Sequence, residues 1–141
     1  MRESLLFVYG TLRRALRHEM HRVLQRAAAF VGTATVRGTL YDLGAYPGLV
    51  AAADSDDLVT GEVYRLERNR AGETLAALDA YEGCTAADPE PHEYRRRVVP
   101  ARLADGSERA AWTYVLNRSP AGLERIPHGD YLAWRRRGGA R

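Results

Sequence analysis

The sequence predicts an α+β protein built on a small, mostly antiparallel β-barrel with two or three short flanking helices. Three observations predict this fold class. Several strand-length segments are apolar throughout or alternate apolar with polar residues, short turns join most of them, and helical spacing occurs only in brief stretches. The strands also follow one another directly, without the regular strand-helix-strand repeat of a parallel sheet.

Composition predicts one globular domain over residues 1–141. The chain is 45% hydrophobic and 28% charged, which is ordinary for a domain of this length. No apolar run is long enough to cross a membrane, and the single cysteine cannot form an internal disulfide. We therefore expect a cytoplasmic protein with no membrane partner, existing as a monomer or a weak homodimer.

The formal net charge is +3, and all 21 basic residues are arginine, since the chain has no lysine. Clusters such as Arg95-Arg96-Arg97 and Arg135-Arg136-Arg137 could contact phosphates. However, the basic residues are spread along the chain and interleaved with 18 acidic ones. The charge pattern favours a solvated surface, and we expect no nucleic-acid partner.

The first elements are a buried strand and a short amphipathic helix. The continuous apolar run from Leu5 to Tyr9 predicts the strand, and Gly10-Thr11 predicts a tight turn after it. Apolar residues then recur at helical spacing from about Glu19 to Ala29. The sequence thus places a turn at the end of its first buried strand.

Strand signals dominate the next segment. Phe30 to Leu43 predicts a long strand, with Ala34, Val36 and Leu40 on one face. Leu49 to Ala53 and Leu58 to Leu66 predict two more strands. Turns over 44–48 and 54–57 separate the three.

The C-terminal half adds a helix, a hairpin and a last short helix. Gly72 to Glu82 predicts the first helix, and Gly83 is placed where a left-handed C-cap is common. Asp105-Gly106 marks a hairpin between strands over 94–103 and 108–117. Asp130 is expected to cap a helix through Arg136, and the tail after it to be loose.

Glu82 is the first candidate for catalysis. At helical spacing it projects between Leu75 and Leu78, so an acid falls on the apolar stripe. Burial there would raise the pKa of the carboxyl group and suit it to proton transfer near neutral pH. The alternative is that Glu82 caps the helix or pairs with an arginine. Asp79, at the edge of the same face, could share a proton with Glu82, bond a backbone group or pair with an arginine.

The turn Tyr9-Gly10-Thr11-Leu12 is a candidate anion site. Gly10 lets successive backbone N–H groups point into a small concave nest. The alternative is an ordinary turn at a strand end. Its spacing matches neither a nucleotide-binding P-loop nor a dinucleotide fingerprint.

Two other sequence patterns are weaker evidence for a functional site. Cys84 could form a cysteine-histidine pair with His92 or His128, but the sequence shows no partner signal. His18-Glu19-Met20-His21 lacks the spacing of a zinc-binding helix and is better explained as a solvated helix start. We expect no metal site.

Two segments resemble the paired signatures of the γ-glutamylcyclotransferase-like superfamily: Phe7 to Leu12, reading FVYGTL, and Leu78 to Gly83, reading LDAYEG. Shorter motifs follow in the order of its short members: Tyr46-Pro47-Gly48, Gly61-Glu62-Val63-Tyr64, Tyr94-Arg95-Arg96, Trp112-Thr113-Tyr114 and Gly129-Asp130-Tyr131. The resemblance is strongest to the γ-glutamylamine cyclotransferase branch, because that branch carries Tyr-Gly-Thr-Leu. One segment differs from the family: it reads Pro127-His128-Gly129-Asp130 where the sequence Ser-Gly-Asp is expected.

This resemblance implies a barrel with a cavity at one end, no cofactor, and a small-molecule γ-glutamyl substrate. It implies intramolecular acyl transfer of the amine-lyase type, in which a γ-glutamyl amide closes to 5-oxoproline and releases an amine. Glu82 would be the general acid and base. The substrate-binding residues would be Tyr9, Gly10, Thr11 and Leu12, with Gly48, Tyr94 and Tyr114 as further candidates.

Tyr94 and Tyr114 have two readings, because a tyrosine can present its hydroxyl to a wet pocket or bury it with a protein partner. The function likewise has an alternative: a non-catalytic member of the same fold that binds a small carboxylate or a partner protein. Retention of Glu82 favours the enzyme.

Overall fold

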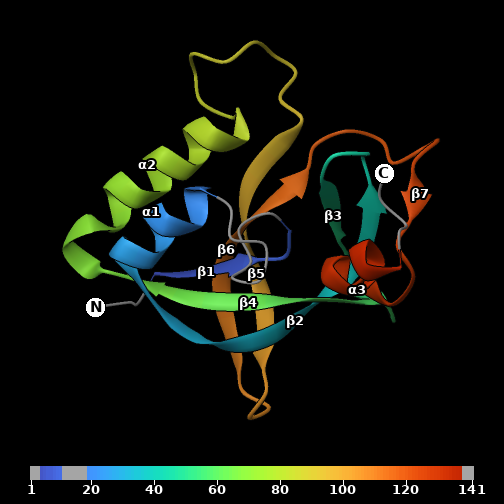
Figure 1. Ribbon diagram of the computed structural model, residues 1–141, viewed down its shortest axis with the longest axis horizontal. Helices are drawn as coiled ribbons and strands as arrows, with labels where there is room; N and C mark the ends of the chain where they lie inside the picture. The colour runs from blue at the N-terminus through green and yellow to red at the C-terminus, as the bar shows by residue number, and fades with distance from the viewer. Residues whose placement is uncertain (1–3, 11–18, 138–141) are drawn as a thin grey trace.

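The structure is a computed structural model that describes residues 4–10 and 19–137 (Figure 1). The strands are β1 (Leu5–Val8), β2 (Ala28–Asp42), β3 (Pro47–Ala51), β4 (Leu58–Leu66), β5 (Tyr94–Leu103), β6 (Glu108–Leu116) and β7 (Glu124–Arg125). The helices are α1 (Glu19–Ala27), α2 (Ala71–Glu82) and α3 (Tyr131–Arg136), with 3₁₀ turns η2 (Arg68–Arg70) and η3 (Pro127–Gly129). Within the described ranges, no helix is long and apolar enough to span a bilayer.

Five of the strands close into a barrel. β1 pairs antiparallel with β4, β4 with β2, β2 with β5, and β5 with β6. The barrel closes where Leu6 of β1 pairs in parallel with Trp112 of β6. The predicted fold class, a small mostly antiparallel barrel with short flanking helices, is therefore confirmed.

β2 belongs both to the barrel and to the strands outside it, β3 and β7. Its first part pairs with β4 as far as Arg37, and its last residues, from Gly38 on, pair with β3 and β7. The predicted inward face is confirmed, since Ala34, Val36 and Leu40 are all buried. A register shift between Phe30 and Gly32 marks a bulge, a feature that increases the twist of a strand.

β1 is buried on both faces. Leu5 and Phe7 belong to the cluster inside the barrel. Leu6 and Val8 point the other way and belong to a second cluster, which includes Leu78 of α2. Because neither face meets water, the strand is apolar at every position, which is why it reads as a continuous run.

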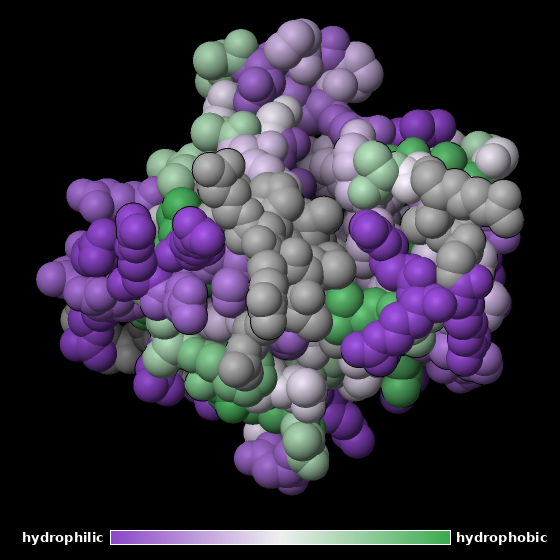
Figure 2. All heavy atoms as spheres, in the orientation of Figure 1, coloured by the Kyte–Doolittle hydropathy of each residue, from purple (hydrophilic) through white to green (hydrophobic). Residues whose placement is uncertain are grey.

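The two longer helices cover the outer side of β1. In Figure 1, α1 and α2 lie next to each other at one end of the barrel. α1 buries Leu24 and Ala27 and exposes Arg22 and Arg26. On the face shown in Figure 2, hydrophilic residues accordingly cover the helices, and apolar ones appear in smaller patches between them.

The two predicted helix caps, Gly83 and Asp130, are confirmed. Gly83 follows α2 in the left-handed conformation, with a φ of 71°. The Asp130 carboxylate accepts hydrogen bonds from the backbone N–H groups of Leu132 and Ala133 at the start of α3. Both caps satisfy backbone groups that a helix end otherwise leaves unpaired.

Some boundaries differ from those expected. α1 ends at Ala27 and β2 begins at once, although the helix was expected to continue to Ala29. β3 begins at Pro47 instead of Leu49, because Pro47 and Gly48 already pair with the end of β2. β7 was not predicted, since two residues carry no periodic signal.

Gly61 of β4 lies close against β1, and it provides a test of the barrel. A Cβ atom there would collide with the Val8 carbonyl oxygen and lie 2.7 Å from Phe7 Cζ. We expect Gly61→Ala to lower the free energy of unfolding by about 1–3 kcal/mol, measured by urea denaturation, because the backbone oxygen cannot move without breaking strand pairing.

Gly72→Ala is the matched control. No atom lies within 4 Å of the added Cβ, and the residue is in α2, so the change should stabilise the protein by about 0.4–1 kcal/mol. Equal effects of the two substitutions would contradict the close approach of β4 to β1.

Candidate active site

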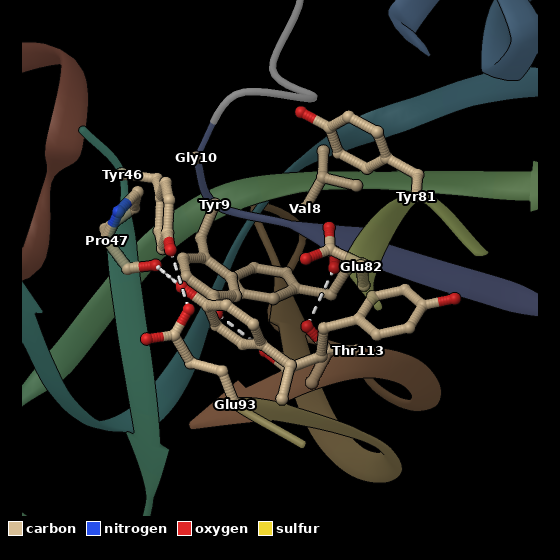
Figure 3. Close-up of a pocket in the computed structure, with 12 residues that line it drawn as sticks. Val8, Tyr9, Gly10, Tyr46, Pro47, Tyr81, Glu82, Glu93 and Thr113 are labelled. Atoms are coloured by element: carbon tan, nitrogen blue, oxygen red, sulfur yellow. Dashed lines mark hydrogen bonds between the residues drawn. The ribbon is translucent and has the colours of Figure 1, made fainter. Parts of the chain in front are cut away.

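A cavity of about 310 Å³ opens where the end of β1, the turn before β3, the end of α2 and the start of β5 meet (Figure 3). It is lined by Phe7, Val8, Tyr9, Gly10, Tyr46, Pro47, Tyr81, Glu82, Glu93, Tyr94, Thr113 and Tyr114. Five predicted site residues, Tyr9, Gly10, Glu82, Tyr94 and Tyr114, are therefore brought together from four separate elements.

A second cavity, of about 450 Å³, lies along the strands away from these residues. Its lining includes Arg37, Arg102 and Glu108 but none of the predicted site residues. The smaller cavity is accordingly the candidate active site.

Glu82 is the last residue of α2, and its side chain reaches the cavity (Figure 3). The preceding turns of α2 are fixed by the burial of Leu75 and Leu78. Burial raises the pKa of the Glu82 carboxyl group to about 7, because a charged carboxylate loses hydration there. Within residues 4–10 and 19–137, this carboxylate makes no hydrogen bond or ion pair.

The hydroxyl group of Tyr9 links three strands beside the cavity. Its hydroxyl donates to the Tyr114 carbonyl at 2.6 Å and accepts from the Leu49 N–H at 3.2 Å. Burial, with the nearby charge of Glu82, raises the pKa of the hydroxyl far above its usual range, so it stays protonated. The hydroxyl of Tyr9 therefore holds β1 to β3 and β6, and any substrate contact by its ring or backbone stays a prediction.

Tyr94 and Tyr114 have protein partners for their hydroxyl groups. The hydroxyl of Tyr94 donates to the Pro47 carbonyl at 2.6 Å, and that of Tyr114 donates to Asp79 Oδ1 at 2.6 Å. Of the two readings left open by the sequence, the buried and satisfied hydroxyl is the one observed. Both side chains still line the cavity, and their role toward a substrate stays a prediction.

Asp79 pairs with an arginine and not with Glu82. The Arg96 guanidinium donates to both carboxylate oxygens, at 2.8 and 3.2 Å, and its carbon lies 4.4 Å from the centre of the Trp112 ring. With the hydrogen bond from Tyr114, this network anchors the last turns of α2 to β5 and β6. It thereby positions the end of the helix that carries Glu82.

The predicted nest is only partly described. Gly10 lines the cavity, and a Cβ there would lie 2.8 Å from Pro47 Cγ, so glycine lets the end of β1 approach the turn before β3. Thr11 and Leu12 lie outside the described residues. Gly48 is buried and is not among the residues that line the cavity, so its predicted role also stays untested.

Sequence reasoning assigned no role to several residues of the cavity wall. Among them are Tyr46 and Glu93, whose side chains meet across the cavity mouth. Glu93 lies at the end of an irregular loop without periodicity, so no sequence signal distinguished it. Tyr46 did have a sequence signal, because it belongs to Tyr46-Pro47-Gly48, one of the motifs that resemble the family.

Cys84 does not form a nucleophilic pair. Its Sγ lies 3.7 Å from the Asp79 carbonyl oxygen, and burial raises the pKa of the thiol to about 11. Nε2 of His92 lies instead within hydrogen-bond distance of the Asp88 carbonyl. In the part of the chain that is described, no group of three or more histidine, cysteine or acidic side chains could hold a metal ion.

Taken together, these features define a class: a small closed barrel with a cavity at one end and, in its wall, a partly buried carboxylate that has no partner among the described residues. Residues 6–133 match the sequence model of the family described as "Gamma-glutamyl cyclotransferase, AIG2-like". The chain belongs to this family, which confirms the superfamily that its motifs resemble.

Individual relatives agree in sequence and fold. A Vibrio cholerae protein named "Putative gamma-glutamylcyclotransferase" is 35% identical over 130 residues, covering 92% of this chain and 96% of its own. The solution structure of Escherichia coli protein ytfP is 34% identical, with a TM-score of 0.62 over 91% of this chain and 96% of its own. The AIG2-like protein of Mus musculus, at 24% identity, shares the fold with a TM-score of 0.67 over 92% of this chain and 95% of its own.

The anchor of α2 gives a prediction about stability. Asp79→Asn leaves the Arg96 guanidinium without its carboxylate in a partly buried site, so we expect the free energy of unfolding to fall by roughly 1–3 kcal/mol in urea denaturation. Asp54→Asn, on an exposed turn, is the control and should change it by less than about 0.5 kcal/mol. A loss no larger than the control's would show that the network does not hold the helix.

Proposed function

We propose that this protein cyclises γ-glutamyl amides, forming 5-oxoproline and releasing an amine. The observation that carries the proposal is the Glu82 carboxylate, which lies in the cavity wall without a partner among the described residues and has a pKa of about 7. At neutral pH such a group exists in both forms, so it can take a proton in one step and return it in another. Membership of the cyclotransferase family supports the same reaction.

The reaction needs no nucleophile from the protein, because the substrate's own α-amine attacks its γ-carbonyl. A bond forms between the α-nitrogen and the γ-carbon, and the bond from that carbon to the leaving nitrogen breaks. Two protons leave the α-ammonium and two reach the released amine, so Glu82 ends in its starting state. Holding the chain folded gives the large advantage of an intramolecular reaction.

The end of β1 is the proposed site for negative charge on the substrate. Backbone N–H groups from Gly10 onward would bind the α-carboxylate or stabilise the oxyanion of the tetrahedral intermediate. The position of Gly10 supports this, since it lines the same cavity as Glu82. The hydroxyls of Tyr9 and Tyr94 donate to backbone carbonyls, which holds these two side chains in the cavity wall.

The central test is Glu82→Gln. The amide keeps the size of the side chain but cannot accept a proton, so 5-oxoproline release from a panel of γ-glutamyl amides should fall by about 10²–10⁴-fold. Glu73→Gln, at an exposed position in the first turn of the same helix, should keep wild-type turnover. Circular dichroism checks that both variants are folded.

Near-normal turnover by Glu82→Gln would refute the proposed role of Glu82. Tight binding of a γ-glutamyl amide without turnover by the wild-type protein would instead favour the alternative, a non-catalytic member of the fold.

The pH dependence gives an independent prediction. Burial disfavours the charged carboxylate, so the protonated form predominates below a pKa of about 7 and the base form predominates above it. We expect kcat/KM to rise about tenfold per pH unit below that value and to level off above it. A limb centred near 4.5, the ordinary value for glutamate, would show that the kinetically important group is an exposed carboxyl instead.

A further inference from the structure

The second cavity of the barrel has no part in the proposed reaction. It measures about 450 Å³ and shares no described lining residue with the candidate active site. Two of its lining residues, Arg102 and Glu108, lie near the tip of the β5–β6 hairpin, which points away from α2 (Figure 1). A cavity of this volume is in the range of small-molecule sites, so we asked which ligand its walls would suit.

The cavity lies where β2 changes its partner strand. β3 and β5 use the same edge of β2, because β4 occupies the other. β5 pairs with this edge at Ala34 and Thr35, and β3 pairs with it from Gly38 on. The two strands diverge from β2 like the arms of a fork, and the cavity opens between them. We call it the fork cavity.

Most of the wall of the fork cavity is apolar. The apolar side chains include Ala51, Ala52, Ala53, Leu58, Val99 and Pro100. Val99 is buried and belongs to the core inside the barrel, so the cavity reaches that core. Leu58 is 46% exposed, although it is a large apolar side chain. Removing such a surface from water is favourable, so these walls suit a ligand with an apolar body.

Two arginines in the lining have no acidic partner among the described residues. The Arg37 guanidinium donates to the Ser55 carbonyl at 2.9 Å, which positions the group without neutralising its charge. The Arg102 guanidinium makes no hydrogen bond or ion pair within residues 4–10 and 19–137. Both positive charges are therefore available to a ligand that enters the cavity.

The nearby acids do not cancel this charge. Those of the turn 54–57 do not line the cavity, and Asp57 among them pairs with Arg125 at 3.0 Å. Glu108 does line it and is opposite Arg102 in the β5–β6 pairing, but no ion pair joins the two. The described lining thus has two positive charges and one negative charge.

We propose that the fork cavity is a second ligand site, which binds a small amphipathic monoanion: a carboxylate at the end of an apolar chain or ring. The carboxylate lies between Arg37 and Arg102, and the apolar part lies along the end of β3 and against Val99. An excess of one positive charge, with Glu108 close by, favours a singly charged head group over the double charge of a phosphate monoester. This site is independent of the proposed reaction at Glu82.

The test measures the binding of octanoate to the purified full chain by titration calorimetry. Octylammonium has the same chain and the opposite charge, so it should bind at least about fivefold more weakly. Butanoate keeps the carboxylate but has four fewer methylene groups, so it should bind about tenfold more weakly or worse. The first comparison tests the arginines, and the second tests the apolar wall.

Amide chemical shifts locate the bound octanoate. We expect the largest changes along Ala51 to Ala53 and at Arg102, and little change at Gly10 and Glu82. Changes centred on the active-site cavity would overturn the proposal, because the anion would then occupy the other site.

Charge variants assign the affinity to individual residues. Arg102→Gln and Arg37→Gln should each weaken octanoate binding by roughly two- to fivefold. Arg95→Gln removes the same charge from an exposed position of β5 that lines neither cavity, and it should bind like the wild type. Glu108→Gln should bind octanoate about twofold more tightly, a gain that a purely structural role for Glu108 would not produce.

A fifth variant tests the space itself. Ala51→Leu adds an apolar side chain at an exposed position of the cavity wall, so it should remove most octanoate binding while the protein stays folded by circular dichroism. Full octanoate affinity in this variant would overturn the proposal.

Three other results would also overturn it: no measurable binding of octanoate, equal affinities for octanoate and octylammonium, or a dimer in light scattering that octanoate dissociates. The dimer would show that a second copy of the chain covers the cavity. Since every readout is binding, failure of this proposal leaves 5-oxoproline release untouched, and absence of that release leaves the fork cavity untouched.

Discussion

The burial of β1 on both faces is the constraint from which the rest of the structure follows. A strand with apolar side chains on both sides needs a barrel interior for one face and a helical layer for the other. β4 and β6 flank it and close the barrel, and α1 and α2 cover its outer side. Because β1 ends at the cavity, the same burial fixes where Tyr9 and Gly10 meet the end of α2.

The end of α2 is held by polar contacts that the apolar core does not supply. Asp79, Arg96 and Tyr114 join the helix to the β5–β6 hairpin, with the guanidinium stacked on Trp112. Glu82 lies about one turn after Asp79 on the same helix, so the contacts that fix Asp79 also fix the position of Glu82. Of the two acids of this motif, Asp79 therefore has a structural role, and Glu82 is the one that we propose acts in catalysis.

The side chains of the cavity wall also differ in whether they have hydrogen-bond partners within the protein. Most of its tyrosine hydroxyls are occupied by protein partners, namely a carbonyl for Tyr9 and Tyr94 and a carboxylate for Tyr46 and Tyr114. These contacts are favourable because a buried hydroxyl without a partner is costly. Glu82 has no such partner among the described residues, and its desolvation is a cost to stability that the proposed role in proton transfer would explain.

Sequence patterns alone were enough to predict the fold class, most strands, the helix caps at Gly83 and Asp130, and the family. These follow from local periodicity, turn chemistry and residue spacing, which act over a few neighbours. The sequence could not decide whether Asp79 would pair with Glu82 or Arg96, how the hydroxyls of Tyr94 and Tyr114 would be used, or that Glu93 would face Tyr46. Those outcomes join residues 17 to 47 positions apart, so only the folded chain, which sets distances and burial together, decides them.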